Sequence, residues 1–110
     1  GHFCKYLSLE KSNNNVEFFN FSKLEFPLKL RKWKRGDKIR PLGMRGSKKV
    51  SDILIDLKIP ILEKENIYVL ESKEDIVWIV GVLISDNYKI EKNSSIYYKI
   101  TFQENYNYHS

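Results

Sequence analysis

The sequence contains a single cysteine, Cys4, and only two histidines, His2 and His109. One thiol excludes an internal disulfide and a cysteine-rich zinc site, and it fits a reducing, cytoplasmic compartment. No run of about 18 apolar residues occurs, and the first residues lack the pattern of a signal peptide, so we expect no membrane association. Gly1-His2 without a methionine suggests a tag remnant and a domain cut from a longer protein.

Motifs for catalysis are equally scarce. A nucleotide-binding phosphate loop needs glycine, four residues, then Gly-Lys-Ser or Gly-Lys-Thr, whereas Gly43 is followed after two residues by Gly46-Ser47-Lys48. Asp52 and Asp56 would suit a metal only if other ligands converged, and we interpret them as exposed acids. Ser85-Asp86 has no histidine base, and a turn explains it as well. We therefore expect no catalytic residue, cofactor or metal in this chain.

Positive charge, in contrast, is concentrated in one segment. Ten of the 19 lysines and arginines lie between Leu28 and Lys49, against the single acid Asp37. Ten positive charges against one negative give this segment +9, and since the whole chain carries +5, the remaining residues carry −4. A concentrated basic surface favours a polyanion such as nucleic acid.

The hydrophobic pattern predicts one domain of α+β class that is mostly β, with one packed helix. The length of 110 residues leaves room for a single modest core. Alternating or continuous apolar runs predict strands at 16–21, 26–31, 37–41, 67–70, 76–84 and 96–102. The run 76–84 is expected to be one strand buried on both faces, with Trp78 in the core. Lys29 and Arg31 alternate with apolar neighbours and are expected to face solvent.

One amphipathic helix is predicted over about 48–58. Val50, Ile53, Leu54 and Leu57 fall at i, i+3, i+4 and i+7, which gives a single apolar stripe. Ser47 is the expected N-cap, and the ring of the following Pro60 ends the helix. Turns are expected at 12–15 and 71–75, and the tail beyond residue 104 has no apolar pattern.

Two places in the basic segment are candidate nucleic-acid contacts. The loop Gly43–Lys49 precedes the predicted helix, whose N-terminus would attract phosphate together with Lys48 and Lys49; the alternative is a turn with solvated lysines. Trp33 lies among basic residues, where an aromatic ring can stack on an unpaired base. Equally, it can cover the sheet edge beneath lysine stems.

Four segments carry a family resemblance: Arg31–Gly43, Gly46–Asp52, Asp56–Pro60 and Ile76–Gly81. Their order and spacing resemble the C-terminal domain of bacterial tRNA(Ile)-lysidine synthetase, over roughly residues 26–90. The resemblance implies a β-sandwich-like domain of the kind also found in phenylalanyl-tRNA synthetase. It further implies a region that helps to recognise the tRNA body, notably the acceptor stem. We therefore expect residues 1–2 to be a tag remnant, 3–104 a single tRNA-binding domain and 105–110 a loose tail.

The resemblance also implies a parent enzyme, a cytoplasmic ligase that attaches lysine to C2 of the wobble cytidine in the isoleucine tRNA with a CAU anticodon. ATP with magnesium would activate the cytidine in an N-terminal catalytic domain that is missing here, so this fragment alone is expected to be inactive. The expected partners are that tRNA and the catalytic domain of the same chain. Lysine and ATP would bind only to the longer protein.

Carried over position by position, the family motif makes basic residues the expected RNA contacts. The leading candidates are Arg31, Arg35, Lys48 and Lys49; the secondary ones are Arg45 and Lys58; Trp33 is the candidate for stacking. One departure is Glu63-Lys64-Glu65, where many members have an arginine. The alternative to RNA recognition is a structural module that packs on a parent protein through an apolar sheet face.

Overall fold

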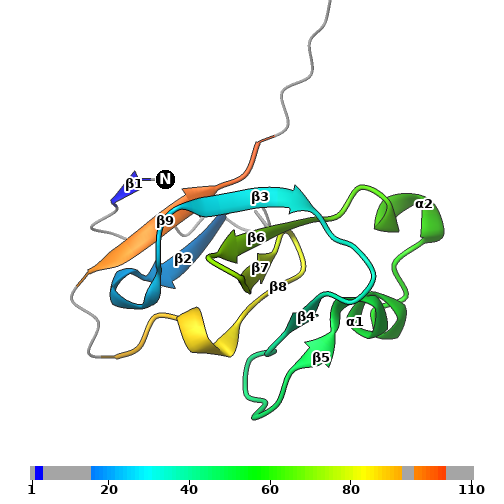
Figure 1. Ribbon diagram of the computed structural model, residues 1–110, viewed down its shortest axis with the longest axis horizontal. Helices are drawn as coiled ribbons and strands as arrows, with labels where there is room; N and C mark the ends of the chain where they lie inside the picture. The colour runs from blue at the N-terminus through cyan, green and yellow to red at the C-terminus, as the bar shows by residue number, and fades with distance from the viewer. Residues whose placement is uncertain (1, 4–15, 93–95, 104–110) are drawn as a thin grey trace, which may run out of the picture.

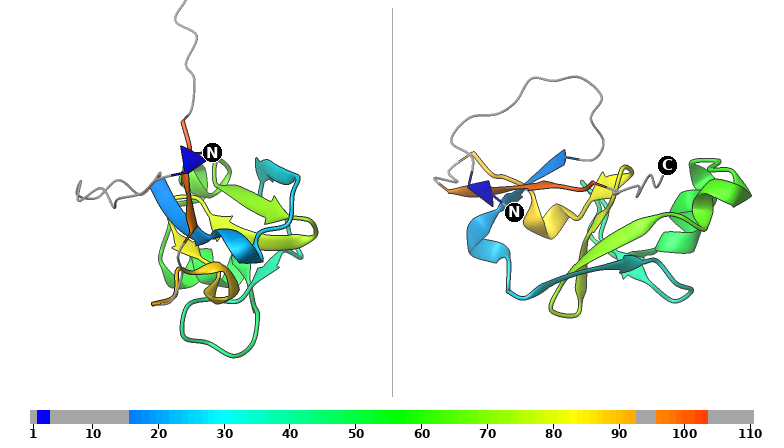
Figure 2. Two further views of the ribbon diagram at one scale, coloured as in Figure 1. Left: turned by 90° about the vertical axis from the view of Figure 1, so that its left-hand side faces the viewer. Right: turned by 90° about the horizontal axis from the view of Figure 1, so that it is seen from above.

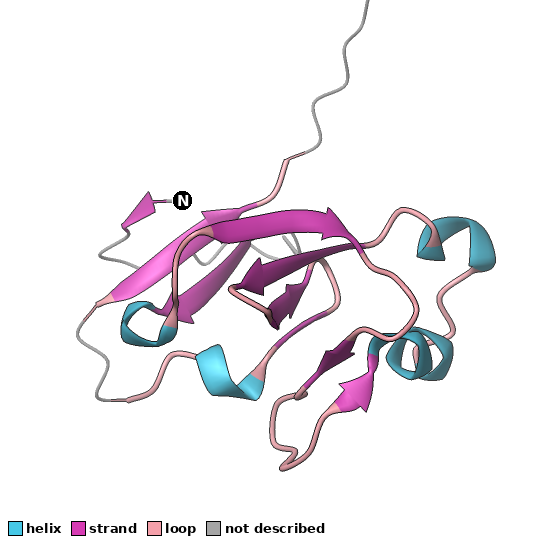
Figure 3. Ribbon diagram, viewed as in Figure 1, coloured by secondary structure: helices cyan, strands magenta, loops and turns pink. Residues whose placement is uncertain are grey.

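The computed structural model describes residues 2–3, 16–92 and 96–103 of the chain. Strands dominate this part (Figure 3) and pair into three antiparallel sheets. The first sheet has the order β1 (His2–Phe3), β9 (Tyr97–Thr101), β2 (Val16–Asn20). The second has the order β3 (Leu28–Lys32), β6 (Tyr68–Ser72), β7 (Asp75–Ile79), β8 (Leu83–Ile84). The third is a hairpin of β4 (Lys38–Ile39) and β5 (Lys48–Lys49).

Four short helices connect these strands in the described part of the chain. They are the 3-10 helices η1 (Phe21–Lys23) and η2 (Asp86–Tyr88) and the α-helices α1 (Val50–Asp56) and α2 (Ile61–Lys64). Both α-helices lie at the end of the molecule opposite to β1, β2 and β9 (Figures 1 and 2). None of the described helices is long and apolar enough to cross a membrane.

The central strands β6 and β7 of the second sheet are buried on both faces of the sheet, which explains why they are rich in apolar residues. One face packs on the first sheet through Phe19 and Trp78, whose rings meet edge to face at 5.7 Å. This first core cluster consists of Phe19, Leu24, Leu70, Val77, Trp78, Val80, Ile84 and Tyr88. The other face packs on α1 and β4, and this second core cluster consists of Ile39, Val50, Ile53, Leu54, Val69, Ile76 and Ile79. The predicted mostly β class, with Trp78 in the core, is confirmed.

The predicted single strand over 76–84 is wrong, because the chain reverses within it. Strand β7 ends at Ile79, and the amide of Val82 donates to the Ile79 carbonyl at 2.9 Å across the turn. Gly81 adopts a φ of +78°, a conformation that glycine reaches without steric strain. The apolar run hides this turn because residues on both sides of it, such as Val80 and Ile84, are still buried.

The predicted helix over 48–58 is wrong at both ends. Residues 48–49 form β5, and the amide of Val50 donates to the Asp37 carbonyl at 2.9 Å, so strand pairing continues up to the first helical residue. Ser47 therefore does not cap the helix; Lys49 is the N-cap, with no side-chain capping bond among the described residues. The stripe residue Leu57 lies after the last turn and is 55% exposed.

The remaining elements agree with the predicted periods more closely. β2 and β9 lie within their predicted ranges, whereas β3 and β6 each extend beyond theirs. The predicted turn at 71–75 is shorter, since only residues 73–74 separate β6 from β7. Helix α2, directly after Pro60, was not predicted. The expected turn at 12–15 and the expected tail lie outside the described residues.

Candidate nucleic-acid interface

Two lysines lie directly opposite one another on the β4–β5 hairpin. The register pairs Lys38 with Lys49 and Ile39 with Lys48. Ile39 is buried in the second core cluster, which fixes the inner face of the hairpin and leaves Lys38 and Lys49 exposed together on the outer face. Opposite residues of an antiparallel pair have Cβ atoms about 4.5–5.5 Å apart, so like charges there repel each other. Neither lysine has an ion-pair partner among the described residues.

Such a pair is suited to a bound anion. A phosphate between the two ammonium groups would replace their repulsion by two attractive contacts. Lys38 is not among the contacts expected from the sequence. Its position opposite Lys49 is recognised only once the strand pairing is known. The signal that could have revealed it is a pair of short segments with basic and apolar residues, 38–40 and 48–50, on the two sides of a loop with two glycines, which is typical of a hairpin.

The other predicted contacts are divided between exposed and paired positions. Arg35 is exposed in the turn before β4, where Gly36 takes a φ of +99°. Arg45 is exposed in the loop between β4 and β5, and Lys58 is exposed just after α1. Lys48 is half-buried and forms an ion pair with Asp56 of α1. Because α1 begins only after β5, Lys48 and Lys49 are strand residues and not the first turn of a helix.

Arg31 is predicted to face solvent, but this prediction is wrong, because two carboxylates hold its guanidinium group inside the fold. Its Nη1 lies 2.9 Å from Asp37 Oδ2, its Nη2 lies 3.0 Å from Asp37 Oδ1, and Nη2 also donates to Glu71 Oε2 at 2.9 Å. Hydrogen bonding to Asp37 is the main cause of the raised pKa of Arg31; burial opposes it, and the hydrogen bond to Glu71 adds to it. Burial alone would raise the pKa of Asp37, but hydrogen bonds from Arg31 and the Lys34 amide lower it. Arg31 thus fixes the turn that carries Arg35.

Trp33 is placed over the edge of the second sheet. Its indole Nε1 donates to the Lys64 carbonyl at 2.6 Å, and its backbone amide donates to the Ile67 carbonyl at 3.1 Å. The half-buried ring packs against the second core cluster. This position corresponds to the covering role weighed for Trp33, whereas stacking on a base stays a prediction.

A polar cleft of about 480 Å³ lies between the β4–β5 hairpin, the β6–β7 turn and η2. Its lining contains four basic and four acidic side chains: Arg31, Lys34, Lys38 and Arg40, with Asp37, Glu71, Glu74 and Asp75. The charges of this cleft are therefore balanced. Tyr88 donates to Asp75 Oδ2 at 2.9 Å, and burial together with Asp75 raises the pKa of Tyr88 to about 12, so its hydroxyl stays protonated.

The residues considered for chemistry have structural roles in the described part of the chain. Ser85 accepts a hydrogen bond from the Asn87 amide at 3.3 Å and so begins η2, which confirms the turn interpretation. Asp86 accepts from the Gly43 amide at 3.0 Å, which is the main cause of its lowered pKa. No group of three or more metal-binding side chains occurs among the described residues.

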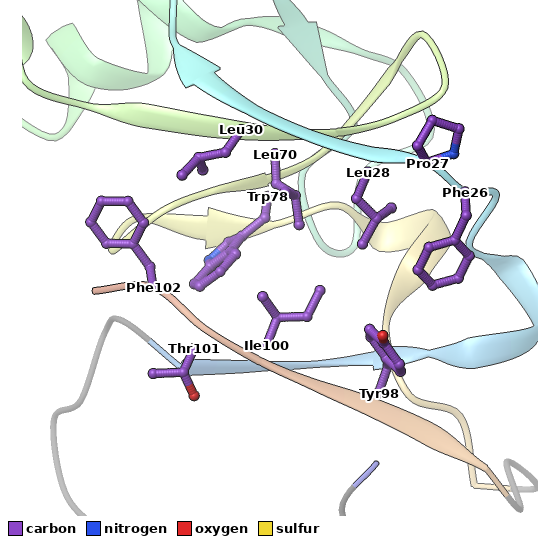
Figure 4. A pocket seen from close by; sticks show the side chains of 10 residues that line it. All are labelled: Phe26, Pro27, Leu28, Leu30, Leu70, Trp78, Tyr98, Ile100, Thr101 and Phe102. Atoms are coloured by element: carbon purple, nitrogen blue, oxygen red, sulfur yellow. The ribbon is translucent and has the colours of Figure 1, made fainter. Parts of the chain in front are cut away.

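An apolar cleft of about 660 Å³ opens between β3 and β9 (Figure 4). It is lined by Phe26, Pro27, Leu28, Leu30, Leu70, Trp78, Tyr98, Ile100, Thr101 and Phe102. Phe26 and Leu30 are each 46% exposed, because the apolar face of β3 extends beyond the first core cluster. With neither a basic nor an acidic side chain in its lining, this cleft offers nothing that would hold a phosphate backbone.

This fold occurs in solved structures of other proteins. The structure described as the crystal structure of the TilS C-terminal domain matches with a TM-score of 0.69 and 22% identity, covering 93% of this chain and 82% of that one. An N-terminal fragment of the phenylalanyl-tRNA synthetase β-subunit from Pyrococcus horikoshii matches with a TM-score of 0.65 and 16% identity, covering 76% and 26%. The expected likeness to the phenylalanyl-tRNA synthetase domain is thus confirmed at the level of fold.

Curated relatives named tRNA(Ile)-lysidine synthase match most of the chain. The Clostridioides difficile protein is 40% identical over 100 residues, covering 91% of this chain and 21% of the relative. The Parabacteroides distasonis protein is 39% identical over 84 residues, covering 76% and 19%, and the Bacillus subtilis protein is 43% identical over 76 residues, covering 68% and 16%. The chain therefore spans about a fifth of the length of these relatives. The sequence model of the family described as the TilS substrate C-terminal domain matches residues 28–100 of this chain. The chain belongs to this family.

Proposed function

We propose that the chain is the tRNA-recognition domain of a tRNA(Ile)-lysidine synthase, and that it docks on the acceptor arm. The observation that carries the proposal is the couple of Lys38 and Lys49, which lie opposite each other and exposed on the β4–β5 hairpin. Membership of the TilS C-terminal domain family supports it. The longer protein would be the ATP-dependent ligase that attaches lysine to C2 of the wobble cytidine in the CAU-anticodon isoleucine tRNA.

The proposed docking depends on phosphate contacts. Lys38 and Lys49 would hold one backbone phosphate, and Arg35, exposed in the turn that Arg31 and Asp37 fix, would reach a neighbouring one. Lys48 would orient the hairpin through Asp56 and need not touch RNA. A-form RNA presents regular phosphate rows beside a shallow minor groove, so a rigid basic edge can recognise its shape. Such contacts position the RNA without reading its sequence.

In this division of work the catalytic steps belong to the rest of the longer protein. Of the residues considered for chemistry, Ser85 is buried and caps η2, and Asp86 accepts a hydrogen bond from the Gly43 amide. ATP, magnesium and lysine would bind elsewhere in that protein, and the isolated chain would form no lysidine. Its contribution would be to hold the acceptor arm while the distant anticodon loop is modified.

The test is RNA binding by the 110-residue chain across a salt series, with isoleucine tRNA and an unrelated RNA hairpin. The variants are Lys38→Ala, Lys49→Ala and the double change, and the matched control is Lys23→Ala on η1, which lies apart from the β4–β5 hairpin (Figure 1). Because the two lysines would hold one phosphate between them, the double change should reduce the magnitude of the slope of log K against log salt by about one, and each single change should reduce it by less. Equal slopes in the wild type, the double variant and the control would overturn the docking role.

A second candidate function is packing on a neighbouring part of the longer protein. The apolar cleft favours it, because Phe26 and Leu30 expose a contiguous apolar surface that a bulky side chain could fill. This candidate predicts negligible RNA binding by the isolated chain and self-association at high concentration. Sedimentation of the wild type beside Leu30→Ser would measure the self-association, which should decrease in the variant.

A further inference from the structure

The loop between β4 and β5 begins with a tight turn over residues 41–44. The amide of Met44 donates to the Pro41 carbonyl at 3.1 Å, which closes a four-residue turn. Gly43, the third residue of this turn, has a φ of +77°. That geometry is typical of a type II turn, in which glycine is favoured at the third position. The backbone conformation at the tip is therefore defined by its own sequence.

Hydrogen bonds with residues of helix η2 hold this turn in place. Asp86 Oδ1 accepts from the Gly43 amide at 3.0 Å, and the Asp86 amide donates to the Arg40 carbonyl at 2.8 Å. Arg40 bridges the two elements, since its Nε donates to the Met44 carbonyl at 2.6 Å and its Nη1 donates to Asn87 Oδ1 at 2.7 Å. Four hydrogen bonds thus fix a loop that projects from the domain.

The side chains that this fixed loop presents are apolar. Leu42 is 51% exposed and Met44 is 44% exposed, and both belong to neither core cluster. A Cβ atom added at Gly43 or Gly46 would have no described atom within 4 Å beyond the adjacent residues, so both glycines border open space on that side. Packing of the described residues gives no reason for two large apolar side chains at this position.

Charge around the tip limits what can cover it. Residues 38–49 contain five lysines and arginines and no acid. Arg40 is held by η2 and Lys48 by Asp56, but Lys38, Arg45 and Lys49 remain exposed without an ion-pair partner in the described part of the chain. A ligand for the whole surface must combine negative charges with a flat apolar face a short distance away. A nucleobase that is exposed beside its own phosphates has this combination.

We propose that Leu42 and Met44 form an apolar platform that packs on the open face of the last base pair of an RNA helix, next to the phosphate held by Lys38 and Lys49. This inference rests on the proposed function and adds to it a contact with the helix end. Leucine and methionine are among the side chains that proteins place against base steps. Rigidity favours the contact because little conformational entropy is lost when the loop binds.

The experiment compares two RNAs that share one stem. The first is a hairpin with one blunt open end, and the second is a dumbbell in which a loop closes each end. The chain is tested as wild type and as Leu42→Ser/Met44→Ser, with Ile61→Ser/Leu62→Ser on α2 as the matched control, because Ile61 and Leu62 are 74% and 78% exposed. A 2-aminopurine base at the open end, or in the middle of the stem, reports packing at each place.

We expect the wild type and the α2 control to bind the open hairpin about tenfold more tightly than the dumbbell, which corresponds to about 1.4 kcal/mol. The Leu42/Met44 double variant should bind both RNAs equally, with an unchanged salt slope, since no charge is removed. Only the terminal 2-aminopurine should change its fluorescence on binding. All three proteins should unfold at the same temperature, because the altered side chains are exposed.

Three results would overturn the platform and leave the docking role intact. They are equal wild-type affinity for the two RNAs, a preserved preference in the Leu42/Met44 variant, and an equal loss of affinity for both RNAs in that variant. If the wild type binds neither RNA, the proposed function and the platform both fail. Vesicles of phosphatidylcholine and phosphatidylserine provide a further check: binding to them that depends on Leu42 and Met44, without any RNA end preference, would assign the tip to a lipid surface instead.

Discussion

Arg31 and Asp37 form a two-point contact in which the guanidinium nitrogens Nη1 and Nη2 each meet one carboxylate oxygen, at 2.9 and 3.0 Å. Asp37 also accepts from the Lys34 amide at 2.7 Å, so the same carboxylate closes the turn that carries Arg35. The side chain of Arg31 is 19% exposed and that of Asp37 is 7% exposed. Arg31, a leading candidate for RNA contact in the sequence, therefore has a structural role: it stabilises the turn that carries Arg35.

Arg31→Ala should lower the stability of the domain more than its affinity for RNA. Removing the guanidinium leaves the nearly buried Asp37 carboxylate without its charged partner, and such losses cost about 3–5 kcal/mol in fully buried pairs and less in this partly exposed one. Urea unfolding measures the loss, and RNA binding is measured under conditions where the variant is still folded. A variant of unchanged stability and reduced affinity would show instead that Arg31 contacts RNA.

The pH dependence of this contact follows from the lowered pKa of Asp37. Since the folded-state pKa lies below the ordinary value of about 3.9, the ionised carboxylate contributes stability above that pH. The contribution is lost as the pH falls through the folded-state pKa. Wild type should thus be more stable than Asp37→Asn at pH 7, and the difference in urea midpoint should shrink below about pH 4. A difference that stayed constant down to pH 2 would contradict the assignment.

Local periodicity was enough to predict the strands whose pattern is uninterrupted. Leu28 and Leu30 alternate with charged residues along β3, and Tyr98 and Ile100 alternate with polar ones along β9. Period-2 alternation is a property of neighbouring residues, so it survives without knowledge of the partner strand. Gly81 shows the opposite case, because both arms of its turn are buried and the pattern does not mark the reversal.

The candidate site was less predictable, because its parts meet through pairing between distant residues. Ser47 is a residue type that often caps helices, yet the β4–β5 pairing keeps residues 48–49 in a strand, so the helix begins only after them. Lys38 gains its significance only from the register that places it opposite Lys49. Arg31 finds one of its two acidic partners, Glu71, forty positions away in sequence. Sequence patterns identify the basic segment, but they do not show which cations the fold uses internally.

Trp33→Phe should destabilise the domain slightly and leave RNA affinity unchanged. Phenylalanine keeps an aromatic ring over the second core cluster but loses the 2.6 Å hydrogen bond from Nε1 to the Lys64 carbonyl, worth about 1 kcal/mol. Thermal unfolding and RNA titration are measured in parallel, with Trp33→Ala as the comparison. If Trp33→Ala loses affinity while Trp33→Phe retains it, and both are folded, the ring stacks on a base.

Lys58 occupies a backbone conformation that favours glycine. Its φ is +57°, and two hydrogen bonds close the end of α1 around it: the Lys58 amide donates to the Ile55 carbonyl at 2.9 Å, and the Ile59 amide donates to the Leu54 carbonyl at 3.1 Å. This is the pattern of a Schellman motif, whose left-handed residue is usually glycine. A lysine at this position is strained, and its side chain is exposed.

Lys58→Gly should therefore stabilise the domain by about 1 kcal/mol, because glycine adopts this conformation without a Cβ clash. Lys58→Ala removes the same charge but keeps the strain, so its stability should stay near that of the wild type. If Lys58 contacts a phosphate, the two variants should lose RNA affinity equally in spite of their different stabilities. Urea unfolding and RNA titration of both variants separate the two effects. Affinity that rises and falls with stability would show that Lys58 acts only through the fold.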